Sequence, residues 1–165
     1  MSTTKGFLYQ WLTLFVIWVI ANSSLDPQIL SSGAVLSLIV TLLFTRFSGA
    51  YREISISPRT IYYYLLYVGV FLVELVKANL NVARLVFSPK VDIHPGIVEI
   101  KTKLKSRTGR LVLANSITLT PGTLVVDIVG DSLFVHWIDV RAQDAESATR
   151  EISARFEKYL EVIYG

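Results

Sequence analysis

The chain has 165 residues, 52% of them hydrophobic, and a mean hydropathy of +0.51. Charged residues make up 18% of the sequence, below the roughly 25% of an average soluble domain, which argues against an ordinary soluble protein. The net charge of +3 comes entirely from residues 1–87, because residues 88–165 hold ten basic and ten acidic side chains. This placement argues against nucleic-acid binding, which needs a basic soluble domain, and the lack of cysteine excludes disulfides and thiolate metal sites.

Two segments near the N-terminus, residues 6–25 and 27–45, carry no Asp, Glu, Lys or Arg. A membrane-spanning helix needs about 20 mostly apolar residues, so we predict a transmembrane hairpin with helices over about 6–22 and 29–46. The first segment also resembles a cleavable signal peptide, but the second apolar segment follows at once, which favours a retained anchor. Small side chains in the second helix would let it approach either its hairpin partner or a helix of another subunit; they are Ser31, Ser32, Gly33 and Ser37.

The arginines of the next connection set the expected orientation in the membrane. Arg46, Arg52 and Arg59 lie between the second and third apolar segments, whereas the turn over residues 22–28 holds no basic residue. Cytoplasmic loops are enriched in Lys and Arg. We therefore expect the N-terminus and the 46–59 connection in the cytoplasm and the 22–28 turn outside.

The third apolar segment, expected as a helix over residues 60–87, changes character partway along. Only 14 uncharged positions precede Glu74 in this segment, or about 21 Å of helix, which is short for a crossing. Beyond them, Glu74, Lys77, Asn81 and Arg84 share one helical face, and charges are costly in hydrocarbon. We expect a tilted or interfacial helix that returns to the cytoplasm with this face towards water or protein. The alternative is a full third crossing, with the N-terminus outside.

Residues 88–165 have the pattern of a small cytoplasmic α+β domain, following a membrane domain over residues 1–87. Val98, Ile100, Thr102 and Leu104 alternate with polar residues, which predicts a half-buried strand. The remaining expected elements are a helix over 107–119, a turn at 120–123, strands over 123–129 and 133–140 joined through Gly130-Asp131, and a helix over 143–163. The predicted order is β-α-β-β-α.

The sequence contains few residues that indicate chemistry. A Glu74–Lys77 pair at helical spacing would serve either a proton or cation path or a salt bridge at a polar helix edge or to a neighbouring subunit. A basic run would form either a solvated strand face or a contact with anionic lipid headgroups. We find no phosphate loop, nucleophile elbow, carboxylate dyad or metal-ligand spacing around His94 and His136, so we predict neither an enzyme nor a bound metal or cofactor. The basic run comprises Lys101, Lys103, Lys105, Arg107 and Arg110.

Two strings give the chain a family resemblance. ELVKAN at residues 74–79, and the more specific ANSITLTPGT at 114–123, resemble the E-type subunit of the Mrp (Mnh, Pha) multisubunit cation/proton antiporters of bacteria, nearly from end to end. The resemblance implies an accessory or assembly subunit in the cytoplasmic membrane, within a complex that exchanges Na⁺ or K⁺ for H⁺. It also implies that other antiporter subunits, which would be the partners together with membrane lipid, carry the main ion path.

Two groups of residues are the candidate functional positions. A stand-alone membrane-anchored module that binds lipid or a small ligand is the rival hypothesis for the function. The helical group would lie at a subunit interface or on an ion path, and the turn group would dock a partner or satisfy backbone groups locally. The first group is Glu74, Lys77, Asn79, Asn81 and Arg84, and the second is Asn115, Ser116, Thr118, Thr120, Pro121, Gly122 and Thr123.

Overall fold

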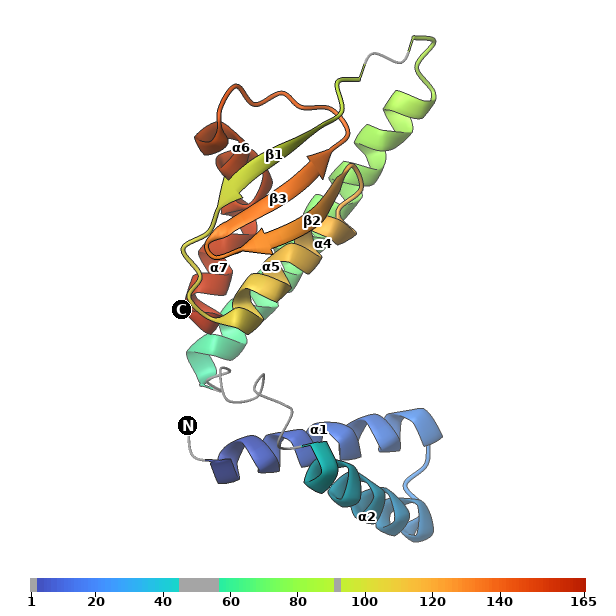
Figure 1. Cartoon of the computed structure of the whole chain (residues 1–165). Coiled ribbons are helices and arrows are strands. Elements are labelled where there is room, and N and C mark those ends of the chain that lie inside the picture. The colour runs from blue at the N-terminus through green and yellow to red at the C-terminus, as the bar shows by residue number, and fades with distance from the viewer. Residues whose placement is uncertain (1–2, 45–56, 91–92) are drawn as a thin grey trace. The chain divides into compact units, whose positions relative to one another are not determined.

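The computed structural model describes residues 3–44, 57–90 and 93–165, which form two compact units, Met1–Ile54 and Ser55–Gly165. The elements of both units are shown in Figure 1. Two helices, Pro27–Phe44 and Pro58–Val86, are long and apolar enough by length and composition to cross a membrane, and a shorter apolar helix covers Gly6–Asn22. Arg46 and Arg52, which support the expected orientation, lie outside the described residues.

The first unit is a hairpin of α1 (Thr3–Asn22) and α2 (Pro27–Phe44). The buried residues of α2 are Gly33, Ser37 and Thr41, which recur every four positions and so lie on one face. Across this face, the indole N–H of Trp18 donates to the carbonyl of Ile29 at 3.0 Å, and that of Trp11 to the carbonyl of Ala34 at 3.1 Å. The small face is therefore used within the hairpin.

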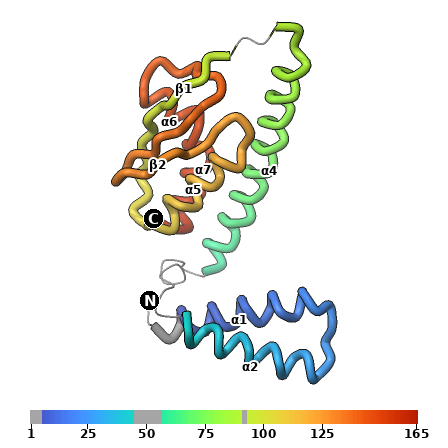
Figure 2. Tube along the Cα trace, turned by 45° about the vertical axis from the view of Figure 1, so that its right-hand side comes forward, coloured from blue at the N-terminus to red at the C-terminus, as the bar shows by residue number. Residues whose placement is uncertain are grey.

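The second unit contains the predicted β-α-β-β-α order after a long helix, and the chain trace is clearest in Figure 2. Its helix α4 begins at Pro58, where Ser57 caps the first turn by accepting a hydrogen bond from the Thr60 amide at 3.1 Å. The remaining elements are β1 (Gly96–Lys101), α5 (Arg107–Leu119), β2 (Thr123–Val129), β3 (Ser132–Trp137), α6 (Ala145–Ile152) and α7 (Ala154–Tyr164).

The last predicted helix, over 143–163, is wrong in one respect, because the structure divides it at Ser153. Ser153 is fully buried, and both its amide and its hydroxyl donate to the carbonyl of Thr149. This back-bonding is a known cause of helix bending, and at Ser153 it separates α6 from α7 without a glycine or proline.

The sheet has the order β1-β3-β2, with both pairs antiparallel, and the helices cover one of its faces (Figure 1). Leu133 and Val135 of the central strand β3 face the helices and are fully buried. Gly122 and Gly130 have φ values of +98° and +64°, which suit the two predicted turns because glycine lacks a Cβ. The core is completed by Ile100, Leu113, Ile117, Phe156, Leu160 and Ile163.

Helix α4 (Pro58–Val86) packs into this α+β core. Tyr67 is buried and shares a hydrogen bond of 2.5 Å with the hydroxyl of Ser116 on α5, and the rings of Phe71 and Phe156 on α7 are 6.3 Å apart. The predicted division at residue 87 therefore marks a change of composition, whereas the compact units divide near residue 55. The opposite face of α4 exposes large apolar side chains, including Ile61, Leu65, Leu72, Val76 and Leu80.

The tight hairpin face gives a first prediction, on glycine substitution. A Cβ at Gly33 would overlap the indole of Trp18, whereas a Cβ at Gly69 of α4 would meet nothing within 4 Å. Gly33→Ala should lower stability by about 1–3 kcal/mol, because the indole must shift and lose its bond to Ile29. The matched control Gly69→Ala should be neutral or stabilising by roughly 0.5–1 kcal/mol. Thermal unfolding of both variants in detergent measures this, and equal stability would contradict the packing described.

Candidate functional site

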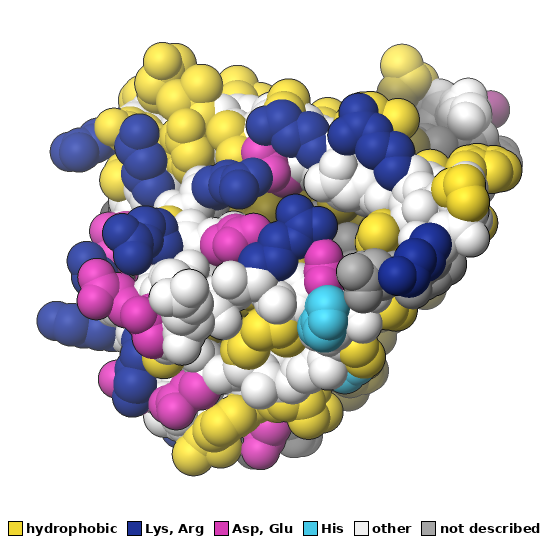
Figure 3. Space-filling view, turned by 90° about the horizontal axis from the view of Figure 1, so that it is seen from above, with side chains coloured by type: hydrophobic (Ala, Val, Ile, Leu, Met, Phe, Trp, Pro, Cys, Tyr) yellow, Lys and Arg dark blue, Asp and Glu magenta, His cyan; other side chains and the backbone are white. Residues whose placement is uncertain are grey.

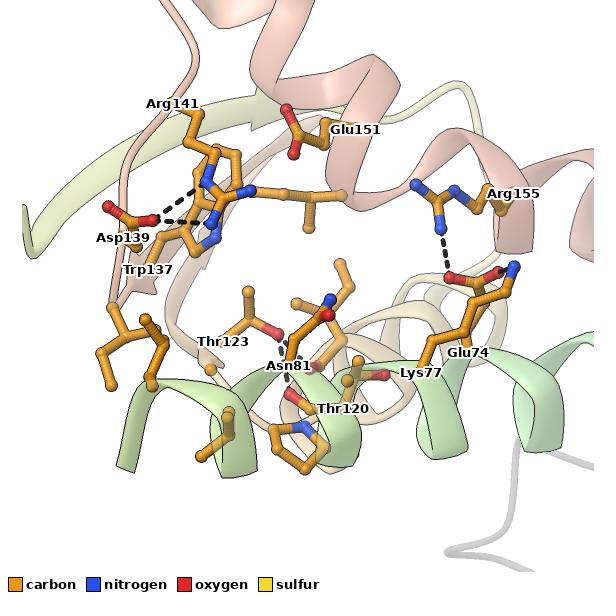
Figure 4. Close-up of a pocket in the computed structure, with 18 of the residues that line it drawn as sticks. Glu74, Lys77, Asn81, Thr120, Thr123, Trp137, Asp139, Arg141, Glu151 and Arg155 are labelled. Carbon is orange, nitrogen blue, oxygen red and sulfur yellow. Dashed lines mark hydrogen bonds and ion pairs between the residues drawn. The ribbon is translucent and has the colours of Figure 1, made fainter. Parts of the chain in front are cut away.

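A cleft of about 210 Å³ lies within the second unit, between α4 and the α+β domain. One wall is α4, and the others are the turn after α5, the end of β3 and the following residues, and helices α6 and α7 (Figure 4). The polar residues that line it include Glu74, Lys77, Asn81, Thr120, Thr123, Asp139, Arg141, Glu151 and Arg155.

Glu74 is the centre of an ion-pair network on the α4 wall. Its carboxylate accepts a hydrogen bond of 2.9 Å from Lys77 one turn along α4, and it also pairs with the guanidinium of Arg155 on α7. The Glu74 side chain is only 12% exposed, whereas those of Lys77 and Arg155 are 59% and 49% exposed. The network therefore shields the carboxylate and ties α4 to α7 across the cleft (Figure 4).

A second ion pair lies on the opposite wall, after β3. The guanidinium of Arg141 donates to Oδ2 of Asp139 through two nitrogens, each at 2.9 Å, and the His94 amide donates to Oδ1 at 3.4 Å. The hydrogen bond from Arg141, with help from the His94 amide, lowers the pKa of the Asp139 carboxyl. Asp139 is therefore an anion at neutral pH and holds Arg141 at the rim.

The charges of the cleft balance. Lys77, Arg141 and Arg155 oppose three carboxylates, those of Glu74, Asp139 and Glu151. A cleft with no excess of either sign has no electrostatic preference for a phosphate or a metal cation. Among the described residues no group of three or more His, Cys, Asp or Glu side chains could hold a metal ion. The chemistry of the walls suits a polar protein segment.

The turn after α5 is built by local hydrogen bonds. The hydroxyl of Thr123 donates to the carbonyl of Ile117 at 2.6 Å, and that of Thr120 to the carbonyl of Ser116 at 2.8 Å. Thr118 accepts from the amide of Val125 at 3.2 Å. The turn's hydroxyls therefore satisfy backbone groups, and the fixed turn places Pro121 and Gly122 in the cleft wall.

The structure unites parts of the two sequence-predicted groups. Glu74, Lys77 and Asn81 of the helical group line the same cleft as residues 120–123 of the turn group. The other predicted residues do not line it. The side-chain amide of Asn79 donates a hydrogen bond to the carbonyl of Leu75, and the guanidinium of Arg84 donates one of 3.4 Å to the side-chain oxygen of Asn81. The hydroxyl of Ser116 shares a hydrogen bond with that of Tyr67. Asn115 and Thr118 are exposed on α5.

Sequence reasoning missed Asp139, Arg141, Glu151 and Arg155. Arg155 follows Ile152 by three positions and so borders the apolar stripe of the last helices, which is the one local signal for its position. Asp139 and Arg141 follow the end of β3, where no periodicity marks them. Only the packing of α4 on α7 and β3 brings these side chains into one site.

The Glu74–Arg155 pair gives a second prediction, on the stability of the second unit. Glu74→Gln and Arg155→Gln should each destabilise it, and the double variant should lose less than the sum, with a coupling of about 1 kcal/mol because Arg155 is half exposed. Lys77→Gln is the control, because Lys77 pairs within α4 and joins no second element. Denaturant unfolding of the four proteins measures the coupling, and strict additivity would show that the pair contributes nothing.

Comparison with known proteins identifies relatives along almost the whole chain. The MNHE family model, described as Na⁺/H⁺ ion antiporter subunit, matches residues 11–163. The E-type subunit of the Na⁺/H⁺ antiporter of Alkalihalophilus pseudofirmus is 34% identical over 149 residues, 89% of this chain and 90% of that protein. The corresponding antiporter subunit of Bacillus subtilis is 34% identical over 152 residues, 88% of this chain and 90% of that protein.

A solved structure is also similar. A chain in the membrane-bound sulfane sulfur reductase, an archaeal respiratory membrane complex, is 43% identical with a TM-score of 0.86. The match covers 97% of this chain and 99% of that chain.

Proposed function

The chain belongs to the MNHE family of Na⁺/H⁺ ion antiporter subunits, and we propose that it is an accessory subunit that holds its complex together without carrying the main ion path. The observation that carries this proposal is that the apolar helices contain few ionisable residues and that Glu74 is already in ion pairs. Residues 6–25 and 27–45 have no charged side chain, and Glu74 forms ion pairs with Lys77 and with Arg155 of α7. A route across the bilayer needs ionisable groups at successive depths, and these helices supply no such series.

The proposed membrane arrangement has α1 and α2 spanning the bilayer and α4 lying at its cytoplasmic surface. The α+β domain contacts the inner face of α4 along most of its length. The contacts begin at Tyr63, whose ring is 6.4 Å from that of Tyr159, and end at Val82, which lies beside Gly122. These contacts cover about 19 residue steps, or about 28 Å of helix. A full crossing by α4 would draw the charged α+β domain into hydrocarbon, which is costly, whereas a surface position leaves the apolar outer face for lipid.

The cleft is the proposed docking site for a segment of a partner subunit. Support comes from its walls and its charge. It is lined by helices and a hydrogen-bonded turn, and its three basic and three acidic side chains match a polar polypeptide better than a small ion. Glu74 then has a positioning role, because its bond to Arg155 keeps the two walls in place.

A second candidate function follows from the comparison with the respiratory complex. The identity with that chain is 43% over 97% of the sequence, higher than the 34% over 89% shared with the antiporter subunit of Alkalihalophilus pseudofirmus. The same accessory role would then be exercised in a respiratory membrane complex. Both candidates require a large assembly, which separates them from a stand-alone membrane-anchored module.

The assembly role gives a third prediction. After mild solubilisation from its own membrane, the tagged chain should migrate in a large complex with other polytopic subunits, and mass spectrometry of that complex would distinguish an antiporter from a respiratory assembly. Glu74→Gln should reduce the fraction of the chain that is found in the complex, because the two walls of the cleft separate. The complex that still forms should keep its cation preference. The exposed Glu161→Gln serves as control. Migration only as a monomer or homodimer would contradict the role, and an intact complex with altered cation preference would place Glu74 on the ion route.

The membrane arrangement gives a fourth prediction, which the lack of cysteine makes simple to test. Leu25→Cys, in the exposed turn between α1 and α2, should react with an impermeant thiol reagent added outside intact cells. Glu146→Cys, on the exposed side of α6, should react only after the membrane is opened. Labelling of both residues from outside would indicate a third crossing by α4 with the N-terminus inside. Labelling of residue 25 only after the membrane is opened would reverse the expected orientation of the hairpin.

A further inference from the structure

We propose that the end of the second unit where α4 begins is a binding surface for anionic phospholipid headgroups. This basic end is defined by Arg59, Lys103, Lys105, Arg107 and Lys158. The inference rests on the proposed surface position of α4 and goes further by assigning the lipid class and the residues that contact it.

Three helix ends meet at the basic end. The guanidinium of Arg59 lies 5.8 Å from the ring centre of Tyr63 on α4, and Tyr63 contacts Tyr159 on α7. On the first turn of α5, Gly109 packs against Tyr164 near the end of α7. Figures 1 and 2 show the start of α4, the start of α5 and the C-terminus at the same end of this unit. Cations far apart in the sequence are thereby gathered on one surface.

The cations of the basic end are exposed and available. None of the five belongs to a salt bridge within the described part of the chain. The nearby acidic side chains include Asp131, whose carbonyl accepts from the Thr102 amide, and Glu157 and Glu161 of α7, against five basic side chains. Glu157 is buried and accepts hydrogen bonds from the Thr102 hydroxyl and the Lys103 amide, at 2.5 and 2.6 Å.

The opposite end of the unit differs in charge. Figure 3, which views the molecule from above, shows Lys and Arg side chains intermixed with Asp and Glu around the histidines. The Arg141–Asp139 pair beside His94 neutralises charge there. The basic end differs in that its five basic side chains, none of them in a salt bridge within the described residues, are gathered on one surface.

Apolar and aromatic side chains border the basic end and favour lipid over an acidic protein as the occupant. Tyr62 and Tyr64 are 59% and 49% exposed, and they adjoin Ile61 and Leu65 on the apolar outer face of α4. Tyrosine rings prefer the headgroup level of a bilayer, and Lys and Arg near a membrane are attracted to anionic lipids. Arg59 also follows Phe44, the end of the apolar helix α2, by only 15 residues in the sequence.

The test uses the full chain with one fluorophore at the basic end. Leu111→Cys, exposed one turn after Arg107 on α5, is labelled and the protein is reconstituted into nanodiscs whose lipid headgroups carry a quencher. The nanodiscs contain phosphatidylcholine alone or a mixture with phosphatidylglycerol. Quenching should increase with phosphatidylglycerol, and the increase should be lost at about 1 M salt, where the Debye length is about 3 Å.

Matched charge variants assign the effect to the basic end. Lys103→Glu/Lys105→Glu should reduce quenching in the anionic nanodiscs to the phosphatidylcholine level, and Lys103→Gln/Lys105→Gln should reduce it partway. Lys90→Glu/Arg150→Glu changes the net charge equally on exposed residues away from the basic end and should leave quenching unchanged. Thermal unfolding checks that all variants are folded, and the glutamine pair decides the outcome if the glutamate pair unfolds.

Two results would overturn the proposal. One is equal quenching in neutral and anionic nanodiscs, and the other is equal loss in the test and control variants. If the basic end instead binds an acidic partner subunit, Lys103→Glu/Lys105→Glu will deplete the native complex while the isolated chain shows no lipid preference. Migration of the wild-type chain outside any complex would refute the accessory role and leave the nanodisc result standing, so the two failures are distinguishable.

Discussion

The burial of the inner face of α4 against α5 and α7 is the constraint on which the second unit depends. Residues 88–165 alone would form a small domain with a modest core, since small domains bury only a limited share of their surface. Helix α4 adds an aromatic row, in which Tyr63 meets Tyr159, Tyr67 meets Ser116 and Phe71 meets Phe156. An apolar helix with the length and composition of a membrane span is therefore an integral layer of the α+β fold.

This packing explains why a charged network lies on an otherwise apolar helix. Glu74 is largely shielded from solvent, and an isolated shielded carboxylate would be unfavourable without its partners. Lys77 and Arg155 supply them, one from α4 itself and one from α7. The same interaction that satisfies Glu74 fixes the distance between two walls of the cleft. Glu74 therefore contributes both to the stability of the second unit and to the shape of the candidate docking site.

Local pattern was sufficient to predict most of the fold. The alternation at Val98 and Ile100, the Pro121-Gly122 turn and the Gly130-Asp131 hairpin each depend on a few neighbouring residues, and all three agree with the structure. The break at Ser153 escaped prediction because a buried serine hydroxyl, rather than glycine or proline, interrupts the helix.

The candidate site was only half predictable for a different reason. Glu74, Lys77 and Asn81 stand out because polar residues at helical spacing are unusual in an apolar segment, and the turn stands out by its proline and glycine. Asp139 and Arg155 are ordinary surface charges by local pattern. They enter the site only because α7 and the end of β3 pack beside α4, a long-range arrangement that periodicity does not encode.

The two faces of α4 differ in chemistry and in what they contact. Its inner face supplies aromatic and ionic contacts to the fold, and its outer face remains apolar over the same length. A helix buried in a soluble core would not keep such a face, and a helix surrounded by lipid would not carry Glu74 against a charged domain. The combination is physically consistent at a boundary between water and membrane. At that boundary the basic residues beside Arg59 and the tyrosines after it would meet headgroups while the cleft stays open to a partner.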